Sequence, residues 1–221
     1  MLLPTVDRAR ARERLTPPMP TDVLWGWLGP LLITAVAGVL RFWNLGRPKA
    51  FIFDETYYAK DAWSLLHFGV EQNYVQGAKD KNLADKHILA GNLHDLFSGN
   101  AAYVVHPPAG KWVIAIGEWL FGMNPFGWRF MVAVTGTLAV LMTARIGRRL
   151  FRSTLLGCVA GLLLSVDAME YVHSRTALLD PLLMFWVLAA FGALVVDRDA
   201  AREQLAATLD EITNALKPRL G

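Results

Sequence analysis

Two adjacent carboxylates, Asp54 and Glu55, are the residues of this chain best suited to acid–base chemistry. They follow shortly after an uncharged run, residues 23–40, that is long enough to cross a bilayer. Aromatic residues surround the pair between positions 51 and 58 and can limit the access of water. A carboxylate within reach of a hydroxyl can take its proton as a new bond forms, so we interpret the pair as catalytic. Taken alone, the two acids are more typical of ordinary loop charges.

Three cations later in the chain suit the binding of a phosphate leaving group. Arg129 and Arg175 present paired guanidinium donors to phosphate oxygens, and Lys111 can add a point charge. Negative charge that accumulates on a phosphate in a poorly hydrated site needs such fixed cations. Either arginine alone is equally compatible with a place at the lipid head groups or with an ion pair that stabilises packing.

Two histidines, His106 and His173, are candidates for support of the same site. Pro107 restricts His106 to an extended backbone, and Pro108 suits the first turn of a following helix, so His106 is held in a defined direction. Each histidine alone is more typical of a solvated or hydrogen-bonded structural side chain. Since no pair has the short helical spacing of a zinc site, we assign no histidine as a metal ligand.

Composition places these residues in a membrane protein. The chain has 221 residues, of which 54% are hydrophobic and 19% charged, and its mean hydropathy is +0.32. The net charge of +3 is small and the arginines occur in short clusters, which argues against binding to nucleic acid. The single cysteine, Cys158, excludes an intramolecular disulfide.

The hydrophobic pattern predicts an all-α, multi-span protein with about four transmembrane helices. The predicted spans are residues 23–40, 130–144, 153–166 and 181–196. The last three are shorter than the roughly 20 residues that a bilayer core requires, so their flanking charged residues are expected at the interface.

The other segments complete this arrangement. Residues 55–68 and 111–122 predict two interfacial helices within and after a long external loop, residues 44–110. Residues 69–105 are polar, contain glycines and lack sustained periodicity, so we predict a loop there. Residues 197–221 have the character of a cytoplasmic loop.

Arginines beside the spans predict the orientation, because basic residues near short loops stay cytoplasmic. One group lies in the leader, residues 1–22, which we therefore interpret as a cytoplasmic tail. A second group lies between the second and third spans. If both are inside, every candidate site residue reaches the same outer face, which requires that residues 111–122 do not cross the membrane.

The candidate residues occur in four ordered blocks: Asp54-Glu55, His106-Pro-Pro-Ala-Gly-Lys111, Gly127-Trp-Arg129-Phe and His173-Ser-Arg-Thr-Ala-Leu-Leu-Asp180. In this combination and order they closely resemble the N-terminal part of the protein O-mannosyltransferases, membrane glycosyltransferases of the GT-C class. The resemblance covers about residues 40–190. The Arg-rich leader and the long spacer between the first two blocks are similar to the bacterial, particularly actinobacterial, branch.

The resemblance implies transfer of mannose from a polyprenyl-phosphate-mannose lipid to Ser or Thr hydroxyls of secreted or membrane proteins, with inversion at the anomeric carbon. The reaction is expected at the extracytoplasmic face of the cell membrane, where membrane lipids and the translocation machinery are further candidate partners. In the family the first acid of the pair is generally assigned as the base, which makes Asp54 the leading candidate and Glu55 its orienting neighbour. A divalent cation bound by one of the two acids stays open as a cofactor.

The family continues with further spans beyond the region of resemblance. We therefore expect residues 197–221 to be truncated, and the chain to be a fragment, a truncated reading frame or one part of an assembly. Two rival functions remain: a GT-C transferase that moves another sugar or acts on a lipid, and a noncatalytic membrane partner that retains the scaffold.

Overall fold

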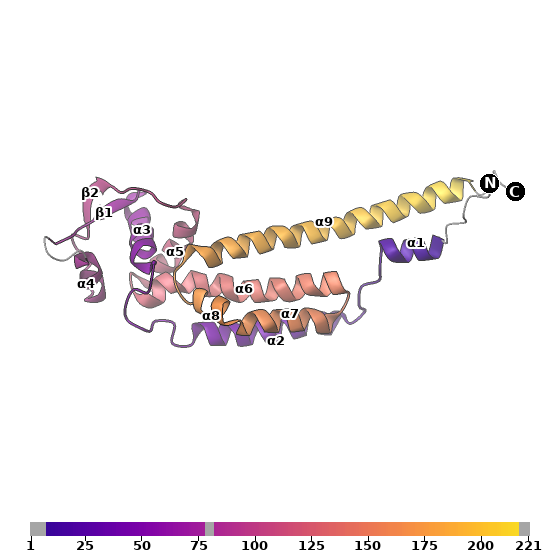
Figure 1. Cartoon of the computed structure of the whole chain (residues 1–221), viewed down its shortest axis with the longest axis horizontal. Helices are drawn as coiled ribbons and strands as arrows, with labels where there is room; N and C mark the ends of the chain where they lie inside the picture. Colours follow the sequence, from indigo (N-terminus) through magenta and orange to yellow (C-terminus); the bar gives the residue numbers. More distant parts are fainter. Residues whose placement is uncertain (1–7, 78–81, 217–221) are drawn as a thin grey trace.

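The computed structural model describes residues 8–77 and 82–216, which are mostly helical (Figure 1). The helices are α1 (Arg8–Leu15), α2 (Val23–Phe42), α3 (Glu55–Phe68), α4 (Leu83–Leu89), α5 (Ala109–Phe121), α6 (Pro125–Phe151), α7 (Thr154–Val166), α8 (Ala168–His173) and α9 (Leu179–Leu216). Two short strands, β1 (Gln72–Tyr74) and β2 (Phe97–Ala101), pair antiparallel. The expected all-α fold class is confirmed.

Three helices, α2, α6 and α9, are long and apolar enough to cross a membrane. The fourth predicted span, residues 153–166, is the 13-residue helix α7, which is apolar but shorter than a spanning helix needs to be. It begins after Ser153, whose side chain accepts a hydrogen bond from the Leu156 amide, and it ends at Asp167. The chain is therefore an all-α membrane protein with three full-length candidate spans.

All three candidate spans are longer than the sequence predicts, α2 by two residues and α6 and α9 by much more. Helix α6 begins at Pro125, because the Asn124 side chain accepts hydrogen bonds from the amides of Phe126 and Gly127 and caps the helix. The prediction of a loop after residue 196 is wrong: α9 runs on to Leu216 without a break. This extension contains no glycine or proline and is rich in strong helix formers. Residues 217–221 of the predicted C-terminal segment lie outside the described residues.

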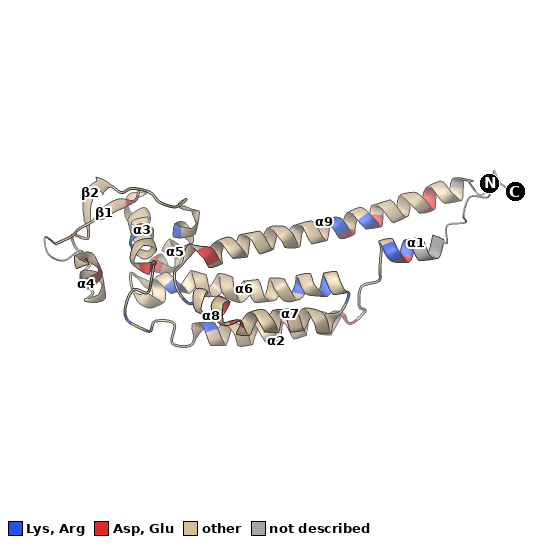
Figure 2. Cartoon of the chain, viewed as in Figure 1, with Lys and Arg blue, Asp and Glu red and all other residues tan. Residues whose placement is uncertain are grey.

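The long helices run side by side, with the segment between α2 and α6 gathered at one end of the bundle (Figure 1). Helix α6 contacts α2, α7 and α9. Gly157 permits the close approach of α7, because a side-chain carbon there would lie 2.5 Å from the Ala144 carbonyl oxygen of α6. Charged residues concentrate toward the two ends and leave long uncharged stretches between them (Figure 2). We call the end that carries α3, α4, α5 and the strands the pocket end, and the opposite end the arginine end.

The pocket end has its own hydrophobic core. Helices α3 and α5 pack together and against the start of α6, through Ala59 and Ala62 of α3, Ile114 of α5, and Trp128 and Val132 of α6. The boundaries of α3 match the prediction, and α5 begins two residues earlier than predicted. The loop predicted over residues 69–105 is only partly correct, because it contains β1, α4 and β2. Residues 78–81 of that loop lie outside the described residues.

Candidate functional site

Glu55 and Arg129 form a buried ion pair at the base of the pocket end. The Glu55 side chain is 0% exposed and the Arg129 side chain 1%. Arg129 Nε and Nη2 donate to the two carboxylate oxygens of Glu55 at 2.7 Å each. The same carboxylate also accepts from the backbone amides of Ile52 and Ala177, at 2.9 Å each. Glu55 therefore joins the segment before α3, helix α6 and the segment before α9.

The guanidinium of Arg129 has no donor left for a ligand. Besides its two bonds to Glu55, it donates to the backbone carbonyls of Leu45, Pro48 and Ala50 at 2.9 to 3.2 Å. An arginine side chain carries five N–H donors, and these five bonds use all of them. In this structure Arg129 therefore holds residues 45–55 in place and is not free to meet the phosphate for which the sequence proposed it.

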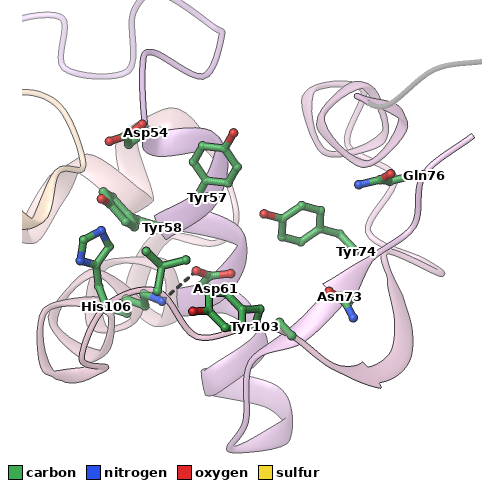
Figure 3. A pocket seen from close by; sticks show the side chains of 12 residues that line it. Asp54, Tyr57, Tyr58, Asp61, Asn73, Tyr74, Gln76, Tyr103 and His106 are labelled. Atoms are coloured by element: carbon green, nitrogen blue, oxygen red, sulfur yellow. Dashed lines mark ion pairs between the residues drawn. The ribbon is translucent and has the colours of Figure 1, made fainter.

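Asp54 is placed very differently from its neighbour. It is the N-cap residue of α3, its side chain makes no capping hydrogen bond, and it is half-buried. Its carboxylate lines a pocket of about 750 Å³ (Figure 3). Since Glu55 and Arg129 fix the backbone one residue away, the Asp54 carboxylate is presented to the pocket from a rigid support. This is the arrangement that a general base requires.

The pocket lies between α3, β1, the segment after β2 and the start of α5. Tyr58 and His106 lie near Asp54, with their rings edge-to-face at a centroid distance of 5.7 Å. Tyr74 points from β1 toward α3, across the pocket from Tyr57 (Figure 3). His106 is exposed and belongs to the pocket, as the sequence predicts for a residue near the acidic pair.

Lys111 lies at the base of the pocket, where two carboxylates surround it. Its Nζ is 2.9 Å from Asp61 and 2.7 Å from Glu71, and its side chain is 1% exposed. Burial raises the pKa of Asp61, while the hydrogen bond and charge of Lys111 oppose this rise. Lys111 is thus brought to the pocket as predicted, but its charge is already compensated.

Two tyrosines of the pocket are held neutral. Burial raises the pKa of Tyr58, and the nearby Asp54 and Asp180 carboxylates add to the effect. Burial likewise raises the pKa of Tyr74. Lys60, which pairs with Asp85, lies over the Tyr74 ring at 3.8 Å from its centroid. Both phenols therefore keep their proton and can donate hydrogen bonds to a ligand.

Arg175 and His173 lie apart from the pocket, where α8 meets the end of α2. Arg175 donates to the Tyr171 hydroxyl and, at 2.6 Å, to the Trp43 carbonyl, and it is half-buried. His173 is the last residue of α8 and is half-buried. Two residues after Arg175, the Thr176–Ala177 peptide reaches Glu55 through the Ala177 amide. Arg175 is therefore tied to the same support as Asp54 but approaches from the helix bundle.

Sequence reasoning missed several parts of the site. Asp61, Glu71 and Tyr74 were not singled out, and the structure brings them to the pocket. One signal was available: on an α3 helix that begins at residue 55, Asp54, Tyr58 and Asp61 are spaced at i, i+4 and i+7 and share one face. No such signal existed for Glu71 and Tyr74. In the two described stretches, no group of three His, Cys, Asp or Glu side chains could hold a metal ion.

Comparison with known proteins gives a family match over most of the chain. The family model described as dolichyl-phosphate-mannose-protein mannosyltransferase matches residues 31–208. No solved structure gives a significant match.

Three curated relatives illustrate the similarity. A polyprenol-phosphate-mannose–protein mannosyltransferase of Mycolicibacterium smegmatis is 46% identical over 190 residues, which cover 84% of this chain and 32% of that protein. A protein of the same name from Corynebacterium glutamicum is 34% identical, over 99% of this chain and 41% of its own length. An undecaprenyl phosphate-alpha-4-amino-4-deoxy-L-arabinose arabinosyl transferase of Pseudomonas fluorescens is 35% identical, over 56% of this chain and 23% of its own length. The chain thus spans about a third of the length of the mycobacterial relative.

Proposed function

Because the chain belongs to the dolichyl-phosphate-mannose-protein mannosyltransferase family, we propose that it forms the base-bearing part of an enzyme that transfers mannose from polyprenyl-phosphate-mannose to protein hydroxyls. The acceptor groups proposed are Ser and Thr side chains. The observation that carries this proposal is the contrast between Asp54, open to a pocket, and Glu55, locked beneath it. The names of the two mannosyltransferase relatives support the choice of donor and of a protein acceptor.

In the proposed reaction, the acceptor hydroxyl oxygen attacks the anomeric carbon of mannose from the face opposite the phosphate. The bond from that carbon to the phosphate oxygen breaks, and polyprenyl phosphate leaves with the electron pair. Asp54 takes the hydroxyl proton, which makes the neutral alcohol a sufficient nucleophile. Attack from the opposite face inverts the anomeric configuration.

The proposed roles of the cations follow from their partners. Arg175 contacts the end of α2 and is half-buried, so we propose that it binds the donor phosphate. All five N–H donors of the Arg129 guanidinium bind acceptors of the protein itself. We therefore propose that Arg129 acts through Glu55 as a positioning residue. Lys111 is paired twice and is proposed to shape the pocket. His106 and His173 remain proposed supporting residues.

The proposed placement in the membrane puts the pocket end outside. Arg148 and Arg149 lie in the last turn of α6, at the far end of the bundle from the pocket. Basic residues beside short loops favour the cytoplasmic side, so the pocket end becomes extracytoplasmic in a multi-pass protein of the cell membrane. An acceptor protein that emerges from the translocation machinery is compatible with this orientation.

A transferase for another sugar is the second candidate function. The similarity to an aminoarabinose transferase favours it, and that relative's name also specifies a polyprenyl phosphate donor. It matches a smaller share of this chain than the mannosyltransferases do, so we prefer mannose.

The test is a transfer assay with membranes that contain the full-length enzyme. Labelled polyprenyl-phosphate-mannose and a Ser/Thr peptide are supplied, and labelled polyprenyl-phosphate-aminoarabinose serves as the competing donor. We expect alkali-labile mannose on the peptide with inverted configuration. Label from aminoarabinose alone, or no label on the peptide from either donor, would refute the proposal.

A further inference from the structure

All residues that line the pocket beside Asp54 belong to the pocket end of the molecule. Its lining residues come from α3, β1, the segments after β1 and β2, and the start of α5. In the described part of the chain, none comes from α2, α6, α7 or α9, the long or apolar helices. A polyprenyl chain gains its binding energy from apolar surface at the membrane. Among the described residues, none of the candidate membrane spans lines this pocket, so it is poorly suited to the long apolar chain of the lipid donor.

The charge of the pocket also disfavours a phosphate. Among the lining residues that the structure describes, Lys111 is the only cation, and Asp61 and Glu71 already surround it within 2.9 Å. Asp54 adds a further carboxylate to the lining of the pocket. An entering anion would meet excess negative charge, whereas a neutral or basic group would not.

The remaining lining residues suit a polypeptide. Tyr57 and Tyr103 are 53% and 89% exposed, and Tyr58 and Tyr74 complete an aromatic wall. Tyrosine offers a large, rigid contact surface at low entropic cost, together with a hydroxyl that forms hydrogen bonds. The β1 segment adds side-chain amides that can pair with peptide groups.

We propose that this pocket is the acceptor subsite, which holds a neutral or basic polypeptide segment with its Ser or Thr at Asp54. The donor phosphate then reaches Asp54 from the opposite side, where Arg175 lies. The inference rests on the proposed function and adds to it a place for the acceptor and a charge preference. Tyr103 and Tyr74 are specificity-determining residues of this subsite, and acidic residues next to the acceptor hydroxyl are disfavoured.

The first experiment measures transfer kinetics of the full-length enzyme in membranes, with a Ser/Thr peptide flanked by lysines. Tyr103→Ala is expected to raise KM for the peptide about tenfold and to leave KM for the lipid donor unchanged. Tyr103 is 89% exposed, so its removal does not threaten folding. The matched control is Val104→Ala, since Val104 is 53% exposed, adjacent in sequence and not a lining residue. An unchanged peptide KM, or a raised donor KM instead, would overturn the subsite.

The second experiment tests the charge preference with two peptides that differ only in lysine or glutamate next to the acceptor. The wild-type enzyme is expected to use the lysine peptide several-fold better, by kcat/KM. Gln76→Lys places a cation in the lining and is expected to shrink or reverse this ratio. Equal use of the two peptides by the wild-type enzyme, or a ratio unaffected by Gln76→Lys, would contradict the proposal.

Peptide binding without donor separates this inference from the proposed function. Binding of the lysine peptide to the purified full-length enzyme, weakened about tenfold by Tyr103→Ala, supports the subsite even if mannose is not the sugar transferred. Conversely, the enzyme could still transfer mannose while Tyr103→Ala and Gln76→Lys leave its affinity for the peptide unchanged. That result would refute the subsite and would not contradict the proposed function.

Discussion

The two ends of the helix bundle hold their charges in different ways. At the pocket end, Glu55 and Arg129 are at most 1% exposed and share two short hydrogen bonds. At the arginine end, Asp199 of α9 is 7% exposed, but its arginine partners keep 19% to 38% of their side chains exposed: Arg149, Arg152 and Arg198.

We call the buried Glu55–Arg129 pair the support, and the ion pairs of Asp199 with its arginines the anchor. A buried pair is costly to desolvate and costly to break, so it holds its surroundings in one geometry. Exposed pairs contribute little each and tolerate rearrangement. The buried support lies next to Asp54 in the chain, where geometry matters for proton transfer, whereas the anchor joins α6 to α9 at the opposite end of the bundle.

The largest effect is expected from Asp54→Asn in the full-length enzyme. The amide cannot accept the hydroxyl proton, so transfer should fall by about 10²- to 10⁴-fold. The protein level in membranes and its thermal stability should stay near wild type, because Asp54 is half-buried and makes no capping hydrogen bond. Asp95→Asn, at an exposed position of the segment between α2 and α6, is the control. Near-normal transfer by Asp54→Asn would show that Asp54 is not the base.

Glu55→Gln tests the buried support and should act mainly on stability. It leaves the Arg129 guanidinium buried without its carboxylate, which should cost about 3–5 kcal/mol of unfolding free energy. Denaturant unfolding of the purified protein in detergent measures this, with Glu203→Gln at an exposed position of α9 as the control. Unchanged stability would mean that the buried pair is not the support of this region.

Arg175→Ala should weaken use of the lipid-phosphate donor. Loss of a charge-assisted hydrogen bond of about 1.5–3 kcal/mol should raise the donor KM by roughly 10- to 100-fold. Arg175→Lys should recover part of this loss, since it keeps the charge but not the paired donors. Lys49→Ala, an exposed cation near the same end, is the control. A donor KM that Arg175→Ala leaves unchanged would show that Arg175 does not bind the donor phosphate.

The smallest effect is expected at the arginine end. Asp199→Asn should reduce unfolding free energy by only about 0–1 kcal/mol, because water already screens its arginine partners. The same detergent unfolding assay compares it directly with Glu55→Gln. If Asp199→Asn lowers the unfolding free energy as much as Glu55→Gln does, the two ends do not differ in the way proposed.

Much of the framework could be predicted from local patterns. Helix α3 has the predicted bounds, because its apolar residues share one face and Gly69 ends it in a left-handed conformation at φ 73°. The apolar runs predicted the three candidate spans, but the fourth predicted span, residues 153–166, is the short helix α7, which does not extend into its flanking residues. The continuation of α9 beyond residue 196 is not part of the prediction, although helix propensity continues through this segment.

By itself, the sequence determined the class of the protein, the order of its long helices and the place of Asp54, His106 and Lys111 near one another at the pocket end. These depend on hydrophobicity and on periodicities of a few residues, which are local properties of the chain. Only the tertiary structure decided which of two adjacent acids meets the pocket and which is locked to Arg129. That choice depends on the carbonyls of Leu45, Pro48 and Ala50 and on the Ala177 amide, which converge only when distant segments fold together.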